Sequence, residues 1–133
     1  LVELGPPTAT GSFAINAPTG TGIASYGFSS TGTASSFANS VLFAAPIVSV
    51  LTGIGDISGD RATLQVNGSQ VAQATTDQGT GNYSNSPIYL FRRGGSTLPF
   101  NGIFTGLIAR GAQSSAAQLA DGNAYINSML GAY

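Results

Sequence analysis

A predicted β-hairpin places the strongest single constraint on how this chain folds. Apolar and polar side chains alternate through residues 61–66, which is the pattern of a strand with one buried face. Asn67-Gly68 follows at once, and this dipeptide supplies the two positive φ angles of a type I′ turn. We therefore expect the chain to reverse at Asn67 and to return through Val71 as an antiparallel strand.

Short segments of the same kind recur along most of the chain, separated by polar and glycine-containing turns. Residues 47–52 are apolar on both faces, which predicts a central strand covered on each side. Residues 29–36 are predicted to be a polar stretch that leaves a strand, residues 18–22 a turn, and residues 75–86 a loop. Further strands are predicted at residues 11–17, 24–28, 41–43, 88–91 and 103–109.

The end of the chain changes to a helical period. Ser114 or Ser115 fits the N-cap position, and Gly131 fits a left-handed C-cap. We therefore predict a helix over residues 114–130, packed on the outside of the strands. Its inward face is expected to carry Leu119, Gly122, Ile126 and Met129 or Leu130.

Together these patterns predict an all-β fold, an antiparallel β-sandwich with one C-terminal helix. A chain of 133 residues has the length of one domain. Residues 1–133 are therefore expected to form a single sandwich domain, with an irregular N-terminal segment at residues 1–10. The aromatic residues on strand patterns are assigned to its core: Phe13, Tyr26, Phe28, Phe100 and Phe104.

The composition excludes several kinds of chemistry. Only 7% of the residues are charged, the net charge is −1, and Lys, His and Cys are absent. Zinc and haem sites, disulfides, a Ser-His-Asp triad and a lysine Schiff base therefore lack their residues. Four positive charges make no basic stripe for nucleic acid. The longest apolar run, residues 41–51, is about half the ~20 residues of a membrane helix, so no membrane insertion is expected.

Three runs near the end of the chain carry a family resemblance. Residues 88–95 (IYLFRRGG) are followed by residues 98–103 (LPFNGI) and residues 107–111 (LIARG). This order resembles the last third of a concanavalin A-like, laminin G-type jelly-roll domain. The similarity covers about residues 11–131. Residues 56–60, 64–68 and 78–83 add to it, since they resemble the lectin-like domains of tailed-phage and prophage proteins.

The resemblance implies a jelly-roll sandwich that lacks its first strands in this chain, because family members have more strands before Gly11. Those strands either belong to another part of the gene product or are replaced by a neighbouring chain at an open sheet edge. One departure is Phe91, where the family often has Gly.

The function implied by the resemblance is adhesion by a non-catalytic virion surface protein, such as a capsid decoration or a tail fibre. Its expected partners are glycans or the host cell surface, together with further copies or neighbouring virion proteins, in an extracellular location. A charge-poor surface suits a protein held in such an assembly. The alternative is a structural capsid or tail building block that contacts only neighbouring subunits.

The predicted loop at residues 75–86 carries the side-chain types that bind sugars. Asp77, Asn82, Tyr83 and Asn85 provide a carboxylate, two planar amides and an aromatic ring on one segment. We therefore take these four residues as the candidate ligand-binding site. The alternative is an ordinary loop between two strands.

Asp56 and Asp60 are the only closely spaced pair of carboxylates. They are predicted to shape a turn by accepting backbone N–H groups. A Ca²⁺ site at this pair is the less favoured alternative, and no other cofactor is expected. A glycosidase pair is disfavoured because related jelly-roll glucanases carry alternating Glu residues on one strand, whereas the single Glu here is Glu3.

Arg92-Arg93 is the one concentration of positive charge. On a regular strand the two side chains point to opposite faces, so they do not grip one anion together. We expect them to pair with Asp56, Asp60 or Asp77. Contact with an acidic glycan or a neighbouring subunit is the alternative.

Overall fold

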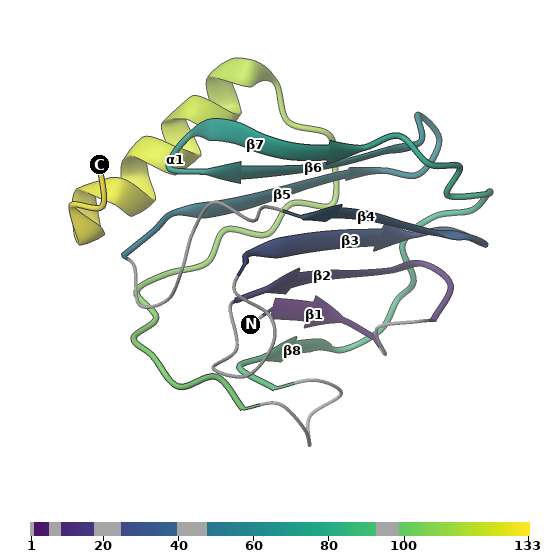
Figure 1. Ribbon diagram of the computed structural model, residues 1–133, viewed down its shortest axis with the longest axis horizontal. Coiled ribbons are helices and arrows are strands. Elements are labelled where there is room, and N and C mark those ends of the chain that lie inside the picture. The colour runs from purple at the N-terminus through teal and green to yellow at the C-terminus, as the bar shows by residue number, and fades with distance from the viewer. Residues whose placement is uncertain (1, 6–8, 18–24, 40–47, 93–98) are drawn as a thin grey trace.

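The structure, a computed structural model, describes residues 2–5, 9–17, 25–39, 48–92 and 99–133. Two antiparallel sheets lie face to face, and a single helix ends the chain (Figure 1). The described elements are β1 (Val2–Leu4), β2 (Ser12–Asn16), β3 (Gly27–Thr31), β4 (Ser35–Asn39), β5 (Leu51–Asp56), β6 (Arg61–Val66), β7 (Ser69–Ala74), β8 (Ile88–Leu90) and α1 (Ala116–Leu130).

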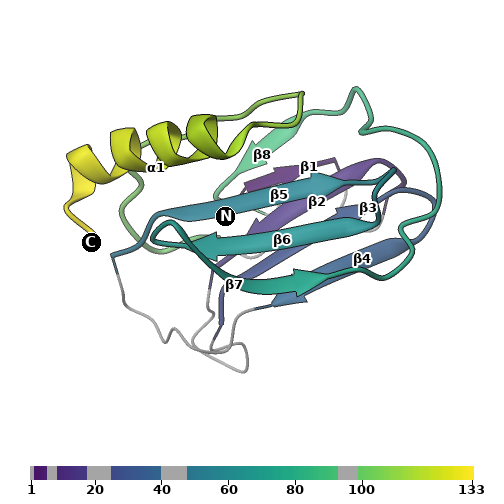
Figure 2. The ribbon, with the colours of Figure 1, turned by 90° about the horizontal axis from the view of Figure 1, so that it is seen from above.

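The two sheets differ in width. The larger has five strands in the order β4-β3-β2-β1-β8, and the smaller has three in the order β5-β6-β7. The smaller sheet covers only part of the larger one, because β5 lies against β2 and β3 while β6 and β7 lie against β3 and β4 (Figure 2). The strands β1 and β8 therefore extend beyond its cover.

The predicted hairpin is confirmed. Asn67 has φ 53° and Gly68 has φ 76°, and β6 and β7 pair in antiparallel register on either side of them. Asn67 is also tied to the chain before β5, since its Oδ1 accepts from the backbone N–H of Val50 at 2.9 Å. Its own backbone N–H donates to the Val50 carbonyl at 2.8 Å. This turn thereby holds the entry to β5 as well as joining two strands.

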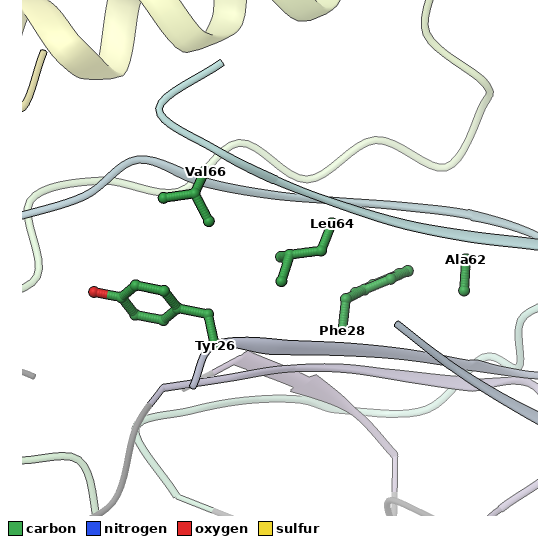
Figure 3. Packing of buried hydrophobic residues seen from close by; sticks show 5 residues of the cluster. All are labelled: Tyr26, Phe28, Ala62, Leu64 and Val66. Carbon is green, nitrogen blue, oxygen red and sulfur yellow. The ribbon is translucent and has the colours of Figure 1, made fainter. Parts of the chain in front are cut away.

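The core forms where the two sheets face each other (Figure 3). Tyr26 and Phe28 project from the larger sheet toward Ala62, Leu64 and Val66 of β6. The three β6 residues are 0–2% exposed, because β6 is the central strand of its sheet. Burying each large side chain of this kind stabilises the fold by roughly 1.5–3 kcal/mol.

The helix begins and ends as its sequence indicates. Ser115 is the N-cap of α1 and forms a capping box with Gln118, and Gly131 adopts the left-handed conformation at the C-terminus. α1 lies against the outer face of the smaller sheet, as predicted. The contact is polar at its centre: buried Asn123 accepts from Thr52 Oγ1 at 2.6 Å and donates to Gln65 Oε1 at 3.3 Å.

The expected inward face of the helix is only half covered. Most of the predicted apolar residues are half-buried, whereas Met129 is exposed. Gly122 lies near Ile108 of the preceding segment, so this face packs partly against the chain that leads into the helix. The residue buried most fully on α1 is Asn123, which the apolar pattern does not identify.

Two sequence-based expectations about the larger sheet are wrong. Residues 1–10 are not wholly irregular, because Val2–Leu4 forms β1 between β2 and β8. A three-residue strand is too short to show alternation. Its central residue, the buried Glu3, is charged, so the segment does not stand out as apolar in the sequence. Residues 29–36 do not lead out of the sheet either: they contain the end of β3 and the start of β4, which pair as a hairpin of small polar residues.

Two further expectations about strands are also wrong. The apolar stretch at residues 47–52 does not form the central strand, because β5 begins at Leu51 and is an edge strand of the smaller sheet. Residues 103–109 form no strand within the described part of the chain, although most of them are apolar. The predicted turn at residues 18–22 and strand at residues 41–43 fall outside the described residues.

Phe91 adopts an unusual backbone conformation. Its φ is 68°, in the left-handed region that favours glycine. The Phe91 ring stacks on Phe100 with centroids 6.1 Å apart and meets Phe104 edge-on at 4.9 Å. These half-buried aromatic contacts stabilise a backbone shape that a side chain otherwise disfavours. Phe100 and Phe104 thus form a small separate cluster rather than part of the main core.

Candidate functional site

The candidate ligand loop, residues 75–86, crosses one end of the sandwich on its way from β7 to β8 (Figure 1). We call this end the rim. The turns at residues 32–34 and 57–60 and the chain at residues 9–11 lie at the same end, because each joins strands that finish there. The rim therefore gathers segments from both sheets around one loop.

Gln78 fixes the first half of the loop. It is fully buried, its backbone N–H donates to Asp60 Oδ1 at 2.9 Å, and its Nε2 donates to the Asp56 carbonyl at 2.9 Å. Its own carbonyl accepts from the Ala34 N–H at 2.8 Å. One residue thus ties the loop to a turn of each sheet.

The second half of the loop is held by its backbone. The Thr80 N–H donates to Thr33 Oγ1 at 3.1 Å, and the Ser84 N–H donates to the Gly11 carbonyl at 2.8 Å. A Cβ on Gly11 would lie 2.6 Å from the Asn82 carbonyl oxygen, so the close approach of the two segments requires glycine there. The loop is consequently anchored along most of its length.

Tyr83 points its hydroxyl into the sandwich. Its Oη lies 2.6 Å from Ser30 Oγ, and its ring meets Phe13 edge-on with centroids 5.7 Å apart. Burial raises the pKa of this hydroxyl above its ordinary value; the Ser30 hydrogen bond opposes the rise, and the charge of Asp56 adds to it. The side chain is 36% exposed, so part of the ring reaches solvent while the hydroxyl serves the fold.

The other three predicted ligand residues lie on the exposed surface of the loop. Asp77, Asn82 and Asn85 are all exposed, and Asp77 Oδ1 accepts from the Gly79 N–H at 2.6 Å. The loop therefore displays a carboxylate, two amides and the exposed part of the Tyr83 ring. Gln78, Thr80 and Ser84 lie between these residues along the chain and carry the hydrogen bonds that hold the loop backbone.

Asp56 and Asp60 shape a turn, as predicted. Asp56 Oδ1 accepts from Ser58 Oγ at 3.0 Å and from the Gly59 N–H at 2.9 Å, while Asp60 Oδ1 accepts from Gln78. Within the described part of the chain, no group of three or more acidic, His or Cys side chains is arranged to hold a metal ion.

Only Arg92 of the arginine pair belongs to the described residues. It is exposed and lies beyond the end of β8 at Leu90. The carboxylates of Asp56, Asp60 and Asp77, which were its expected partners, accept hydrogen bonds from backbone N–H groups of the rim.

Gln78, Ser30 and Gly55 belong to the site although sequence reasoning did not identify them. Gln78 has the appearance of a surface loop residue, and nothing local reveals that its partners lie 18 and 22 residues away. Gly53 and Gly55 do provide a signal, because glycines within a strand often mark the close approach of another group. Here a Cβ on Gly55 would overlap the Tyr83 hydroxyl.

Comparison with family models, curated protein sequences and solved structures gave no significant match. In the described part of the chain, no helix has the length and apolar character needed to cross a membrane.

Proposed function

We propose that this chain is a non-catalytic, lectin-like domain that binds glycans through the rim loop at residues 75–86. The observation that carries the proposal is the contrast within this loop. Its backbone is tied to both sheets through Gln78, Thr80 and Ser84, whereas Asp77, Asn82 and Asn85 face solvent. A polar surface fixed in advance loses little conformational entropy when a ligand binds.

The mechanism is adhesion by weak polar contacts. The exposed amides and the Asp77 carboxylate match the hydroxyl groups of a sugar, and the exposed part of the Tyr83 ring offers an apolar surface beside them. Each hydrogen bond contributes about 0.5–1.5 kcal/mol, so a single site binds weakly. Many copies in one assembly supply the avidity that a single copy lacks.

The wider setting rests on the resemblance to concanavalin A-like, laminin G-type domains of tailed phages. Two antiparallel sheets with a C-terminal helix support the sandwich architecture that this resemblance implies. We therefore place the protein on a virion surface, as part of a capsid decoration, a tail fibre or a similar component. Its partners are host glycans and neighbouring virion subunits.

An array of bacterial surface polysaccharides tests the proposal. The protein is presented in multivalent form, as wild type and as the double variant Asn82→Ala/Asn85→Ala. The expected result is binding by the wild type and a loss of about tenfold in the double variant, from two hydrogen bonds of ordinary strength. Gln70→Ala, which removes an exposed amide near the opposite end of the sandwich, serves as the matched control and is expected to bind like wild type.

The adhesion proposal is wrong if no polysaccharide binds, or if the double variant binds as well as the control. Release of sugar from any bound polysaccharide would contradict the non-catalytic assignment.

A second candidate function, a structural building block, is favoured by exposed apolar side chains away from the rim. Ile103 is 94% exposed, and Ile108 is 50% exposed. Because the chain has no cysteine, Asn82→Cys introduces its only thiol. Rapid labelling of this thiol in the assembled particle supports adhesion, whereas protection from labelling supports the structural role.

A further inference from the structure

The strand β8 forms one outer edge of the larger sheet (Figures 1 and 2). Its pairing with β1 shows which backbone groups are used. The Gly5 N–H donates to the Pro87 carbonyl at 3.0 Å, and the register then continues with Leu4 opposite Ile88 and Glu3 opposite Tyr89. In an antiparallel ladder, hydrogen-bonded and non-hydrogen-bonded pairs alternate.

This alternation fixes the direction of each β8 backbone group. Tyr89, like Pro87, belongs to a hydrogen-bonded pair of the β1–β8 ladder, so its N–H and C=O face Glu3 of β1. Ile88 and Leu90 form the other type of pair, so their N–H and C=O groups point away from β1. The outer edge of β8 therefore presents donors and acceptors in the arrangement that a further strand requires.

The side chains at this edge are apolar. Ile88 is 47% exposed and Leu90 is 39% exposed, although their partners Leu4 and Val2 are buried. The difference follows from their places in the sheet, because β1 lies between β2 and β8 whereas β8 is the outermost strand and has a neighbouring strand on one side only. The apolar side chains thus lie directly beside the available backbone groups.

β8 also lacks the features that usually protect a sheet edge. Natural edges carry charges, inserted prolines or bulges that prevent pairing with another chain. No charged residue occurs anywhere in residues 78–91, and Pro87 lies just before the strand rather than within it. Two copies of this edge can therefore meet without like-charge repulsion.

The edge is complementary to itself. If two copies pair antiparallel about Tyr89, Ile88 of each copy lies opposite Leu90 of the other. These are the residues whose backbone groups point outward, so each exchanges hydrogen bonds with its opposite number. The two apolar side chains are then neighbours across the new ladder, an arrangement that stabilises antiparallel pairs.

We propose that β8 is an interface between two copies of this chain, which joins their five-stranded sheets edge to edge. A contact through a three-residue strand buries much less surface than the ~800 Å² that each partner buries in a stable complex. The dimer is accordingly weak in solution and gains strength where many copies are held together. This proposal is independent of glycan binding by the rim.

Sedimentation velocity and amide hydrogen exchange, each measured over a range of protein concentrations, test the proposal. The expected result is a reversible dimer whose fraction rises with concentration. Hydrogen exchange at the Ile88 and Leu90 amides should slow as the fraction of dimer rises. The Tyr89 amide should exchange slowly at every protein concentration, because it donates to β1. Monomer at all concentrations, or dimerisation without slower exchange at these two amides, would overturn the proposal.

Leu90→Lys provides a variant, since a lysine at an edge opposes pairing. It is expected to abolish the dimer while the circular dichroism spectrum stays unchanged; Ile88→Lys repeats the test should Leu90→Lys fail to fold. Ile103→Lys is the matched control, because it places the same charge at a more exposed apolar residue outside β8. A dimer lost in the control but kept in the β8 variants contradicts the proposed interface.

Discussion

Gly53 and Gly55 determine how closely aromatic side chains approach β5. Both lie on its inner face, where a Cβ on Gly53 would overlap the ring of Phe28 and a Cβ on Gly55 would overlap the hydroxyl of Tyr83. The two glycines weaken the strand slightly, since glycine has the greatest conformational freedom when unfolded. In return, one aromatic ring fills the core and another anchors the rim loop.

The substitution Gly55→Ala tests this role at the rim. The added methyl group must displace Tyr83 from Ser30, so the free energy of unfolding should fall by about 1–3 kcal/mol in urea denaturation. Gly111→Ala is the control, because no atom lies within 4 Å of the added Cβ. Equal effects from the two substitutions would contradict the close approach at Gly55.

The buried hydroxyl of Tyr83 predicts a pH dependence of stability. Burial raises its pKa in the folded state, so the folded protein favours the protonated form. The stabilising contribution is complete below the unfolded pKa of about 10 and is lost as the pH rises through the raised folded value. Urea denaturation across this range should show the wild type losing more stability than Tyr83→Phe. Parallel curves for the two proteins would show that Tyr83 does not titrate in this way.

At the scale of elements, α1 is attached to the smaller sheet through a polar contact. Asn123 is buried and bonds both Thr52 of β5 and Gln65 of β6. Such a contact specifies position, because each partner would be left buried without its hydrogen bond if the helix shifted. The half-buried apolar residues of α1 add buried apolar surface on either side of Asn123.

Asn123→Ala should therefore destabilise the protein although it improves intrinsic helix propensity. We expect a loss of about 1–3 kcal/mol in chemical denaturation, since Thr52 and Gln65 lose their partner. The exposed Gln113→Ala, just before the helix, is the control and should change stability by less than about 0.5 kcal/mol. An Asn123→Ala variant as stable as the control would mean that the apolar contacts alone position α1.

Elements with local signals could be predicted from the sequence, and elements defined by distant partners could not. The Asn67-Gly68 hairpin and the capped helix carry their own turn and cap residues, and both are confirmed. β1 depends on β2 and β8 for its pairing, so its three residues show no pattern of their own. Residues 103–109 show the opposite case, since a mostly apolar run forms no strand unless a neighbouring edge pairs with it.

The same distinction applies to the candidate site. The loop at residues 75–86 and its exposed polar residues were predicted from composition. Its anchors were not, because the Ser30 partner of Tyr83 lies 53 residues away and the Thr33 partner of Thr80 lies 47 residues away. The sequence therefore identifies the exposed groups of the rim, and only the fold reveals that their backbone is fixed.

For the whole molecule, the unequal sheets separate two surfaces of different character. The rim gathers Asp56, Asp60 and Asp77, three of the five acidic residues, at one end of the sandwich. The β8 edge lies along one side of the larger sheet and its strand has no charge.

The uncharged edge predicts how association responds to salt. Screening weakens contacts between charged groups and leaves apolar and backbone contacts intact. Raising the ionic strength from about 0.05 M to about 1 M should therefore leave the dimer fraction unchanged or increase it in sedimentation experiments. Dissociation of the dimer at high salt would show that charged residues outside β8 hold the copies together.

We propose the rim loop as a fixed, exposed surface for glycans. Titration of the ¹⁵N-labelled protein with a host polysaccharide fragment, followed by NMR chemical shifts, tests it most directly. We predict that the shift changes concentrate at Asp77, Asn82 and Asn85 and spare the β6–β7 turn at Asn67. Changes confined to β8 or to residues 103–108, or no saturable change with any fragment, would contradict the claim.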